Sequence, residues 1–157
     1  MNENIRIRKA EPADVKTILN LIEELAEYEK LSDKVTATED KLIDTIFGKD
    51  KIVEVWLAEI NDEPAGQVLF FRNYSTFLAN PGFYIEDLYV RPQFRGKGIG
   101  KKLLNKVIQL AAEKNYGRVE WCVLNWNEPA INFYKKMGAV AMDEWTTFRL
   151  TEEKFSG

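Results

Sequence analysis

Apolar residues near the start of the chain recur at two different intervals, which predict one strand and two helices. Ile5 and Ile7 alternate with arginines, a pattern typical of a short strand. An acidic, proline-containing start then precedes a helical period over Val15–Tyr28. Thr36–Glu39 matches a capping box, and the apolar period behind it predicts a shorter helix that ends at Gly48.

The rest of the chain alternates between strand and helix patterns. Two runs of alternating apolar residues flank the turn residues Asn61–Pro64, so they predict a β-hairpin. The expected elements are strands at Val53–Ile60, Ala65–Arg72, Phe83–Val90, Val119–Val123 and Thr146–Leu150, and helices from Gly100 to about Lys114 and over Pro129–Met137. The resulting order, β α α β β β α β α β, predicts an α/β or α+β domain with a mixed sheet.

Length and charge restrict the class of protein. The 157 residues suit one domain spanning 1–157, and a net charge of −3 argues against a nucleic-acid partner, which needs a concentrated basic surface. The N-terminus shows no apolar segment typical of a signal peptide, and no apolar run approaches the ~18 residues of a membrane span. We therefore predict a cytoplasmic protein with neither nucleic acid nor membrane as a partner.

Two features of the composition narrow the possible chemistry. The chain has no histidine, which excludes a Ser-His-Asp or Cys-His nucleophilic system and a histidine-ligated metal site. Its single cysteine, Cys122, excludes an internal disulfide and a CxxC redox pair. Acid–base work must then fall to Glu, Asp, Tyr, Lys or water, and we predict no metal.

A glycine-rich segment, Arg95-Gly96-Lys97-Gly98-Ile99-Gly100, lies between a predicted strand and a predicted helix. Glycines let the backbone approach a ligand closely, and the following helix offers free N–H groups to an anion. The spacing fits neither the GxGxxG dinucleotide fingerprint nor the GxxxxGK[ST] P-loop. The segment predicts a polyphosphate site of another kind, and the alternative is a tight turn before a solvated basic helix.

The glycine segment and its surroundings resemble a known family. Arg95-x-x-Gly98-x-Gly100 matches the (Q/R)xxGx(G/A) pyrophosphate loop of the GNAT acetyltransferase superfamily. Further segments extend the resemblance, across residues 7–150, to the spermidine/spermine (diamine) N-acetyltransferase branch: Leu25–Glu29, Tyr84–Val90 and Asn125–Ala139.

Some segments depart from the pattern of that branch. Val140–Trp145 and the turn near Asn61 look shorter, and Met137 stands in place of a basic residue. These departures leave the predicted cosubstrate site intact and concern the distal part of the substrate pocket.

The resemblance implies a GNAT fold, with a mixed and mostly antiparallel sheet flanked by helices, a homodimer, and acetyl-CoA as cosubstrate. The residues implied to bind acetyl-CoA are Leu88, Tyr89, Val90, Arg95, Gly96, Lys97, Gly98, Ile99, Gly100, Lys101, Asn127, Glu128, Pro129, Ala130 and Tyr134. The residues predicted to contact the amine substrate are Tyr28, Glu29, Glu86, Glu120, Trp121, Cys122 and Glu144.

Acetyl transfer to an amine sets three chemical tasks. The amine, with a pKa of about 10.4, arrives protonated, so an acid such as Glu86 must accept a proton, directly or through water. Asp87 would point to the other side of a regular strand, unless a bulge intervenes. By the resemblance, Leu88 N–H donates to the oxyanion and Tyr134 donates to the leaving thiolate. The alternatives are a solvent-facing Glu86 and a Tyr134 that belongs to a core face.

We predict an N-acetyltransferase that acts on a primary amine of a small cationic molecule, a polyamine or diamine. Two alternatives stay open. The first is an acceptor that is an amino acid, a lysine analogue or a protein lysine. A Lys or Arg beside Glu86 would favour an amino acid, because its carboxylate needs a cation. The second is an acyl-CoA-binding module without catalysis, which would not need Tyr134.

Overall fold

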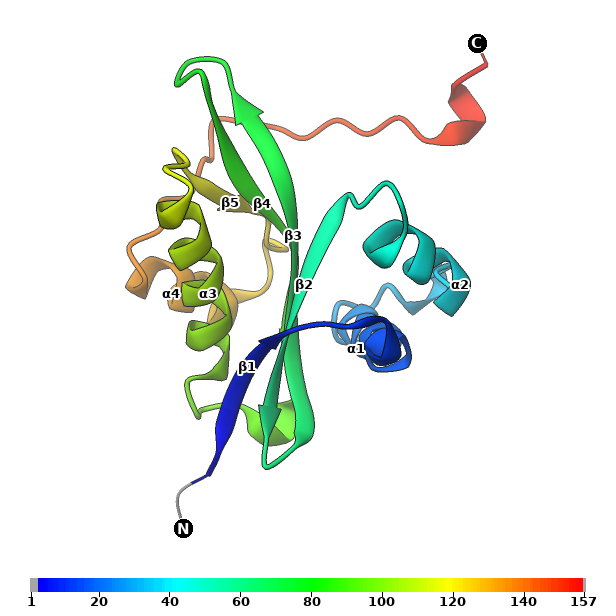
Figure 1. Ribbon diagram of the computed structural model, residues 1–157. Coiled ribbons are helices and arrows are strands. Elements are labelled where there is room, and N and C mark those ends of the chain that lie inside the picture. Colours follow the sequence, from blue (N-terminus) through cyan, green and yellow to red (C-terminus); the bar gives the residue numbers. More distant parts are fainter. Residues whose placement is uncertain (1–2, 157) are drawn as a thin grey trace. The chain divides into compact units, whose positions relative to one another are not determined.

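The computed structural model describes residues 3–156 (Figure 1). The chain divides into two compact units, the first ending at Cys122 and the second beginning at Val123. Among the residues described, no helix is both long and apolar enough to span a membrane.

One mixed β-sheet forms the centre of the first unit. Its strands are β1 (Ile5–Lys9), β2 (Val53–Ile60), β3 (Glu63–Ser75), β4 (Asn80–Val90) and β5 (Val119–Trp121), which lie side by side in that order. Neighbours from β1 to β4 are antiparallel, whereas β5 runs parallel to β4. The predicted mixed and mostly antiparallel sheet is therefore confirmed.

Short turns bring consecutive strands together. Asn61 and Asp62 connect β2 to β3 with φ values of 51° and 68°, the backbone of a two-residue hairpin turn. The predicted hairpin is thus confirmed. β3 and β4 extend to Ser75 and Asn80, beyond their predicted ends, because each strand satisfies the backbone groups of the other there.

Two helices cover one face of the sheet: α1 (Val15–Tyr28) and α2 (Glu39–Leu42), which continues as a π-helical turn over Ile43–Phe47 (Figure 1). The fully buried side chains of Ile18 and Leu21 in α1 share one apolar core with Leu57 of β2 and Leu69 of β3. Burying each such side chain contributes roughly 1.5–3 kcal/mol, so this core fixes α1 against the strands.

The start of α2 differs from the predicted capping box. Thr38 is the N-cap, and its hydroxyl oxygen accepts a hydrogen bond from Lys41 N at 3.2 Å. The prediction that Thr36 caps the helix with Glu39 at the third position was wrong. Thr38 satisfies a free N–H group of the first turn, so the helix begins two residues later.

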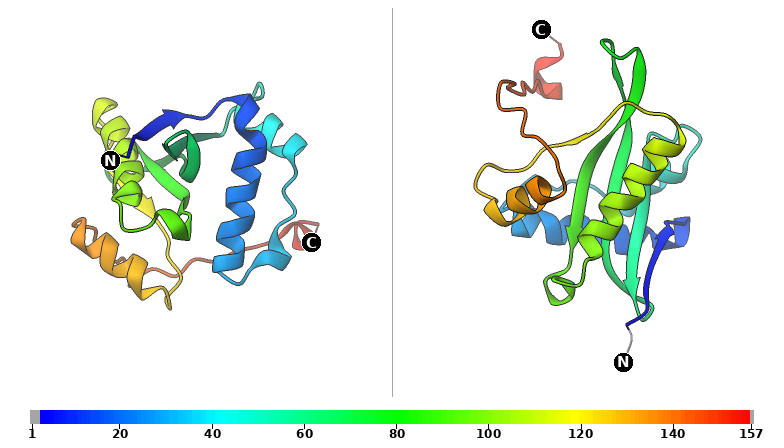
Figure 2. Two further views of the ribbon diagram at one scale, coloured as in Figure 1. Left: turned by 90° about the horizontal axis from the view of Figure 1, so that it is seen from below. Right: turned by 90° about the vertical axis from the view of Figure 1, so that its left-hand side faces the viewer.

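α3 (Ile99–Glu113) covers the opposite face of the sheet (Figures 1 and 2). Its Leu103, Leu104 and Val107 are fully buried. On this face Phe70 of β3 and Phe83 of β4 meet edge to face, with ring centroids 4.9 Å apart. The chain reaches α3 from the end of β4 through the glycine segment, which fixes that segment at one end of the sheet.

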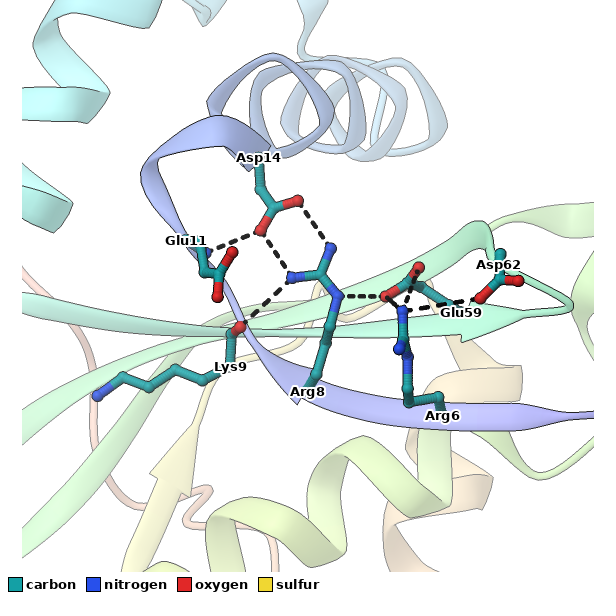
Figure 3. A network of polar contacts seen from close by, with 7 residues as sticks. All are labelled: Arg6, Arg8, Lys9, Glu11, Asp14, Glu59 and Asp62. Carbon is teal, nitrogen blue, oxygen red and sulfur yellow. Dashed lines mark hydrogen bonds and ion pairs between the residues drawn. The ribbon is translucent and has the colours of Figure 1, made fainter.

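An ion-pair network joins β1, the start of α1 and β2 (Figure 3). Arg8 donates two hydrogen bonds to the Asp14 carboxylate, at 2.8 and 2.7 Å, and a third to Glu59. Arg6 approaches Glu59 at 3.2 Å and Asp62 at 3.7 Å. The side chains of Asp14 and Glu59 are only 15% and 7% exposed, so these arginines compensate charges that water no longer solvates. We call this set the arginine network.

The second unit contains α4 (Glu128–Lys136). Asn127 caps it by accepting a hydrogen bond from Ala130 N at 3.4 Å, and Pro129 lies in the first turn, where a missing N–H costs nothing. This helix was predicted to within one residue at each end. The prediction of a strand over Thr146–Leu150 was wrong, since no strand forms in residues 123–156. An alternating pattern becomes a strand only when its backbone pairs with a neighbour.

Candidate active site

The glycine segment forms an open turn that leads into α3. Gly96 and Gly98 both have φ values of 79°, and Gly98 is the N-cap of α3. A Cβ atom at either position would meet no atom within 4 Å, so open space lies against this backbone. Gly98 O accepts from Lys102 N at 3.0 Å, and the N–H groups that precede Lys102 in the first turn have no helical acceptor. Free N–H groups at the start of a helix, beside open space, suit a phosphate anion.

Arg95 and Lys97 of this segment have partners within the protein. Lys97 forms an ion pair with Glu3, and Arg95 Nε donates to Val90 O at 3.0 Å. The Arg95 guanidinium also lies 4.9 Å from the ring centroid of Tyr28. Arg95 therefore ties the end of β4 to the end of α1.

β4 has an open edge beside the glycine turn. β5 pairs only with Phe83–Ile85, so no strand in the described part of the chain flanks residues 86–90 on that side. Arg91 N donates to Ala65 O toward β3, at 2.8 Å. Alternation along an antiparallel strand then turns the N–H and C=O groups of Leu88 and Val90 toward the open edge, and those of Tyr89 toward β3.

A β-bulge at Glu86 changes the face of the sheet to which the side chains of the following residues in β4 point. Leu69 pairs with Asp87, and its neighbour Phe70 pairs with Ile85, so Glu86 has no partner in β3. Leu69 belongs to the core under α1, and Asp87 opposite it faces the same side. The charge of Glu86 acts on Asp87 and on Tyr84, which lies opposite Phe71 on this face, so Glu86 also belongs to the α1 face. The bulge is the exception to the regular alternation that would have separated Glu86 from Asp87.

Three carboxylates gather on this face: Glu86 and Asp87 of β4, and Glu29 at the C-cap of α1. We call them the acidic cluster. Burial raises the pKa of Asp87 to about 6, and the negative charges of Glu86 and Glu29 contribute to that increase. Burial also raises the pKa of Glu29. The causes of the raised pKa of Asp87 are burial and the carboxylates of Glu86 and Glu29, and no cation is among them.

A second polar group lies on the same face, where β4 meets β5. Tyr84 Oη donates to Cys122 Sγ at 2.9 Å. Burial, followed by this hydrogen bond, raises the pKa of Tyr84, and the nearby charges of Glu86 and Glu120 add to the effect. Glu120 lies opposite Tyr84 in the sheet and pairs with Arg118 Nε at 3.1 Å. The neutral Tyr84 phenol thus lies near both Glu86 and Glu120.

The structure brings most of the predicted substrate residues of the first unit to one face of the sheet. Those that meet there are Glu29, Glu86, Glu120 and Cys122, while exposed Tyr28 lies against Arg95 at the end of α1. Strand alternation places Trp121 on the opposite face, with Ile85.

The remaining predicted residues belong to the second unit. Tyr134 and Phe133 of α4 have ring centroids 5.5 Å apart, and Asn127–Ala130 form the start of that helix. Glu144 is exposed in the segment that follows. The roles of these residues remain predictions from the resemblance.

Sequence reasoning did not select Asp87, Tyr84 or Arg118 for the site. The bulge that turns Asp87 toward α1 depends on the pairing of β3 with β4, and no local pattern marks it. For Arg118 a signal was available. The alternation predicted over Val119–Val123 continues back to residue 118, which places Arg118 and Glu120 on one face.

Comparison with known families gives a match over most of the chain. Residues 16–139 match the acetyltransferase (GNAT) family. The match runs from α1 through the glycine segment to the residues just after α4. It therefore contains the glycine turn, the open edge of β4 and the acidic cluster.

Individual relatives cover almost all of this chain. The thialysine N-epsilon-acetyltransferase of Bos taurus is 39% identical over 95% of this chain and 94% of its own. The L-ornithine N5-acetyltransferase NATA1 of Arabidopsis thaliana is 38% identical over 93% of this chain and 84% of its own. The spermidine/spermine N(1)-acetyltransferase-like protein 1 of Homo sapiens is 33% identical over 95% of this chain and 23% of its own. The resemblance found in the sequence is confirmed.

Proposed function

This chain belongs to the acetyltransferase (GNAT) family, and from that premise we propose that it acetylates the distal primary amine of a small basic molecule. The family uses acetyl-CoA as the acetyl donor. The acidic cluster carries the proposal: three carboxylates lie close together beside the open edge of β4, and the charges of two of them help to raise the pKa of the third, Asp87. A cationic amine supplies the missing counter-charge.

The glycine turn and the β4 edge hold the donor. Backbone N–H groups from Gly96 to Lys101 bind the pyrophosphate, and Lys101 adds positive charge. The predicted contribution of the Arg95 N–H is corrected, because that group donates to Pro92 O at 3.3 Å. The outward-facing backbone groups of Leu88 and Val90 hydrogen-bond the pantetheine arm as an added strand would. Asn127–Ala130 complete the cosubstrate site, as the resemblance implies.

The acidic cluster binds the acceptor as an ammonium ion and then removes a proton from it. We assign that proton to Asp87 in place of Glu86, the candidate from the sequence, because a carboxyl group with a pKa of about 6 is ionised at neutral pH and yet is a stronger base than an ordinary aspartate. Glu86 and Glu29 hold the cation in place. The freed amine nitrogen then bonds to the thioester carbonyl carbon.

Two further groups stabilise the charges that this attack produces. Leu88 N–H donates to the oxyanion of the tetrahedral intermediate. When the C–S bond breaks, Tyr134 gives its phenolic proton to the thiolate, as the resemblance implies, and the second proton that the acylated nitrogen loses restores the phenol. We expect Tyr134→Phe to lower kcat at least tenfold and to leave acetyl-CoA affinity unchanged. Turnover and calorimetric titration measure the two, and near-wild-type kcat would remove Tyr134 from this role.

Among basic molecules, an amino acid with a side-chain amine is the first candidate. Relatives named for thialysine and ornithine are 39% and 38% identical to this chain. A polyamine or diamine is the second candidate, favoured by the 33% identical relative named for spermidine and spermine. Both carry the distal ammonium group that the acidic cluster binds.

A panel of amines tests the proposal. Purified protein, acetyl-CoA and a thiol indicator are combined with ornithine, lysine, thialysine, putrescine, spermidine or a lysine peptide. We expect turnover with at least one small amine at a KM between about 1 μM and 1 mM. Binding of acetyl-CoA without acetylation of any amine would instead indicate an acyl-CoA-binding module.

The remaining sequence predictions complete the proposal. The chain acts as one functional domain over residues 1–157, as a cytoplasmic homodimer without a metal. Its partners are small molecules and include neither nucleic acid nor membrane. Light scattering of the purified protein tests the homodimer.

A further inference from the structure

A cation and a carboxylate stand side by side at β5, on the same face as the acidic cluster. Arg118 Nε lies 3.1 Å from Glu120 Oε1, and Asn73 Nδ2 donates to the same oxygen at 3.4 Å. The two charged side chains are 43% and 37% exposed, so a solute can reach them. Since Asn73 holds Glu120 from the β3 side, the carboxylate has a fixed place even when Arg118 turns to another anion.

The register of the sheet sets the spacing between this pair and the acidic cluster. Glu120 lies opposite Tyr84, which pairs with Phe71 of β3, whereas Asp87 pairs with Leu69. Two strand positions therefore separate them, about 7 Å along the sheet. Four or five bonds join the α-carbon of ornithine or lysine to its terminal nitrogen, and they extend over about 5–6 Å. An amino acid of this size spans the two groups.

We propose that Arg118 and Glu120 bind the head group of a basic α-amino acid, with Arg118 on its carboxylate and Glu120 on its α-ammonium. This inference rests on the proposed function, in which the acidic cluster binds the distal amine of the same molecule. The α-ammonium and α-carboxylate lie on one carbon atom, so an adjacent Glu and Arg match them in sign and spacing. A diamine has an ammonium group for Glu120 but no carboxylate for Arg118, so the guanidinium gains no anion from it.

The chemical class of acceptor follows from this arrangement. A guanidinium recognises a carboxylate through a planar pair of N–H groups, which an ammonium cannot replace. The protein therefore selects ornithine, lysine and their close analogues over putrescine and cadaverine, which have the same chains without the carboxylate. The sequence associated a Lys or Arg beside Glu86 with an amino-acid acceptor, whereas the cation proposed here, Arg118, lies beside Glu120 on the same face.

Matched substrates and variants test the inference. Ornithine is compared with putrescine, and lysine with cadaverine, for the wild type and for Arg118→Gln, Arg118→Lys and Arg72→Gln. Arg72 is an exposed arginine on β3 whose side chain points to the opposite face, so it is the matched control. Urea unfolding verifies that each variant is folded.

We expect the wild type to prefer each amino acid over its diamine at least tenfold in kcat/KM. Arg118→Gln should lower kcat/KM for ornithine by about 10- to 100-fold, mainly through KM, and leave putrescine unchanged or improved. Arg118→Lys should retain an intermediate value, and Arg72→Gln should match the wild type. Equal losses for ornithine and putrescine, or no loss, would overturn the inference.

Calorimetric titration of ornithine into CoA-loaded protein separates this inference from the proposed function. Ornithine binding that Arg118→Gln weakens, in a protein that acetylates no amine, would support the head-group site and reject the proposed function. Acetylation of putrescine without any binding of ornithine would support the proposed function and reject the head-group site.

Discussion

Carboxylates lie at both ends of α1, and the two ends differ in what compensates their charge. At the N-terminal end, Asp14 accepts two hydrogen bonds from Arg8, which lower its pKa. At the C-terminal end, burial raises the pKa values of Glu29 and Asp87, and no cation is among the causes of either shift. The arginine network balances its charges within the fold, whereas the acidic cluster needs a cation from outside.

The helix itself reinforces this difference. An α-helix carries partial positive charge at its N-terminus and partial negative charge at its C-terminus. Asp14 at the N-cap of α1 interacts favourably with that dipole, and Glu29 at the C-cap does not. Burial and the helix thus both oppose a negative charge at Glu29, which is typical of a binding site rather than of a stabilising contact.

Removal of one carboxylate from the acidic cluster should have the largest effect. We expect Asp87→Asn to lower kcat/KM by about 10²- to 10⁴-fold, because the amide keeps the shape of the side chain but cannot accept a proton. Thiol-release kinetics measure the change. Asp33→Asn is the control, since Asp33 is exposed and pairs only with Lys34 among the described residues. Activity of Asp87→Asn within tenfold of the wild type would assign the proton transfer elsewhere.

Removal of a cation from the arginine network should instead affect stability. Arg8→Met leaves Asp14 and Glu59 without their shared partner, and we expect the free energy of unfolding to fall by about 3 kcal/mol. Urea unfolding at pH 7 measures it, with exposed Arg72→Met as the control. At urea concentrations at which Arg8→Met is still folded, its kcat/KM should equal that of the wild type. A stable Arg8→Met protein with impaired catalysis would contradict the separation between the two clusters.

The two clusters should also differ in how pH affects stability. The pKa of Asp87 rises from 3.8 to about 6 on folding, so between those values the folded protein keeps a proton that the unfolded chain loses. The ionisation of Asp87 therefore lowers the free energy of unfolding as the pH rises from about 4 to above 6. The total decrease over this range is at most about 3 kcal/mol. Asp14 has a lowered pKa and acts in the opposite direction, because its stabilising contribution disappears as the pH falls.

This difference in sign leads to a specific measurement. Asp87→Asn should be more stable than the wild type at pH 8 and nearly equal to it at pH 4. Urea unfolding at the two pH values gives the comparison. A stability difference that is the same at both would show that protonation of Asp87 is not its cause.

The smallest expected effect concerns Glu29. Glu29→Gln should raise KM for the amine by about two- to fivefold and leave kcat nearly unchanged, since a partly exposed ionic contact contributes up to about 1 kcal/mol. Initial rates over a range of amine concentrations measure it. A fall in kcat as large as that of Asp87→Asn would place Glu29 next to the reacting atoms.

The sequence predicted the parts of this protein that depend on local patterns. Periodicity located α1, α3, α4 and the hairpin of β2 with β3 to within a few residues. The apolar face of each element recurs at a regular interval within a short stretch of sequence, so it can be recognised without knowledge of distant partners. The glycine turn was also predictable, since Gly96 and Gly98 adopt backbone angles that few other residues accept.

What the sequence missed depends on distant partners. The pattern at Thr146–Leu150 suits a strand, but pairing decides whether one forms. The direction of Asp87 depends on which residue of β3 lies opposite it, and a one-residue bulge reverses that direction. Alternation in the sequence places Arg118 and Glu120 on one face, but only the register of β5 with β4 places that face beside Tyr84.

The bulge at Glu86 also determines what a single-codon deletion would do to this protein. Elsewhere in a strand, loss of one residue shifts the register and turns half of the strand to the wrong face. Here Phe70 and Leu69 are consecutive and already pair with Ile85 and Asp87. Deleting Glu86 would join those two pairs into a regular ladder and leave every other side chain of β4 on its present face. Evolution can therefore remove one carboxylate from this surface without rebuilding the sheet around it.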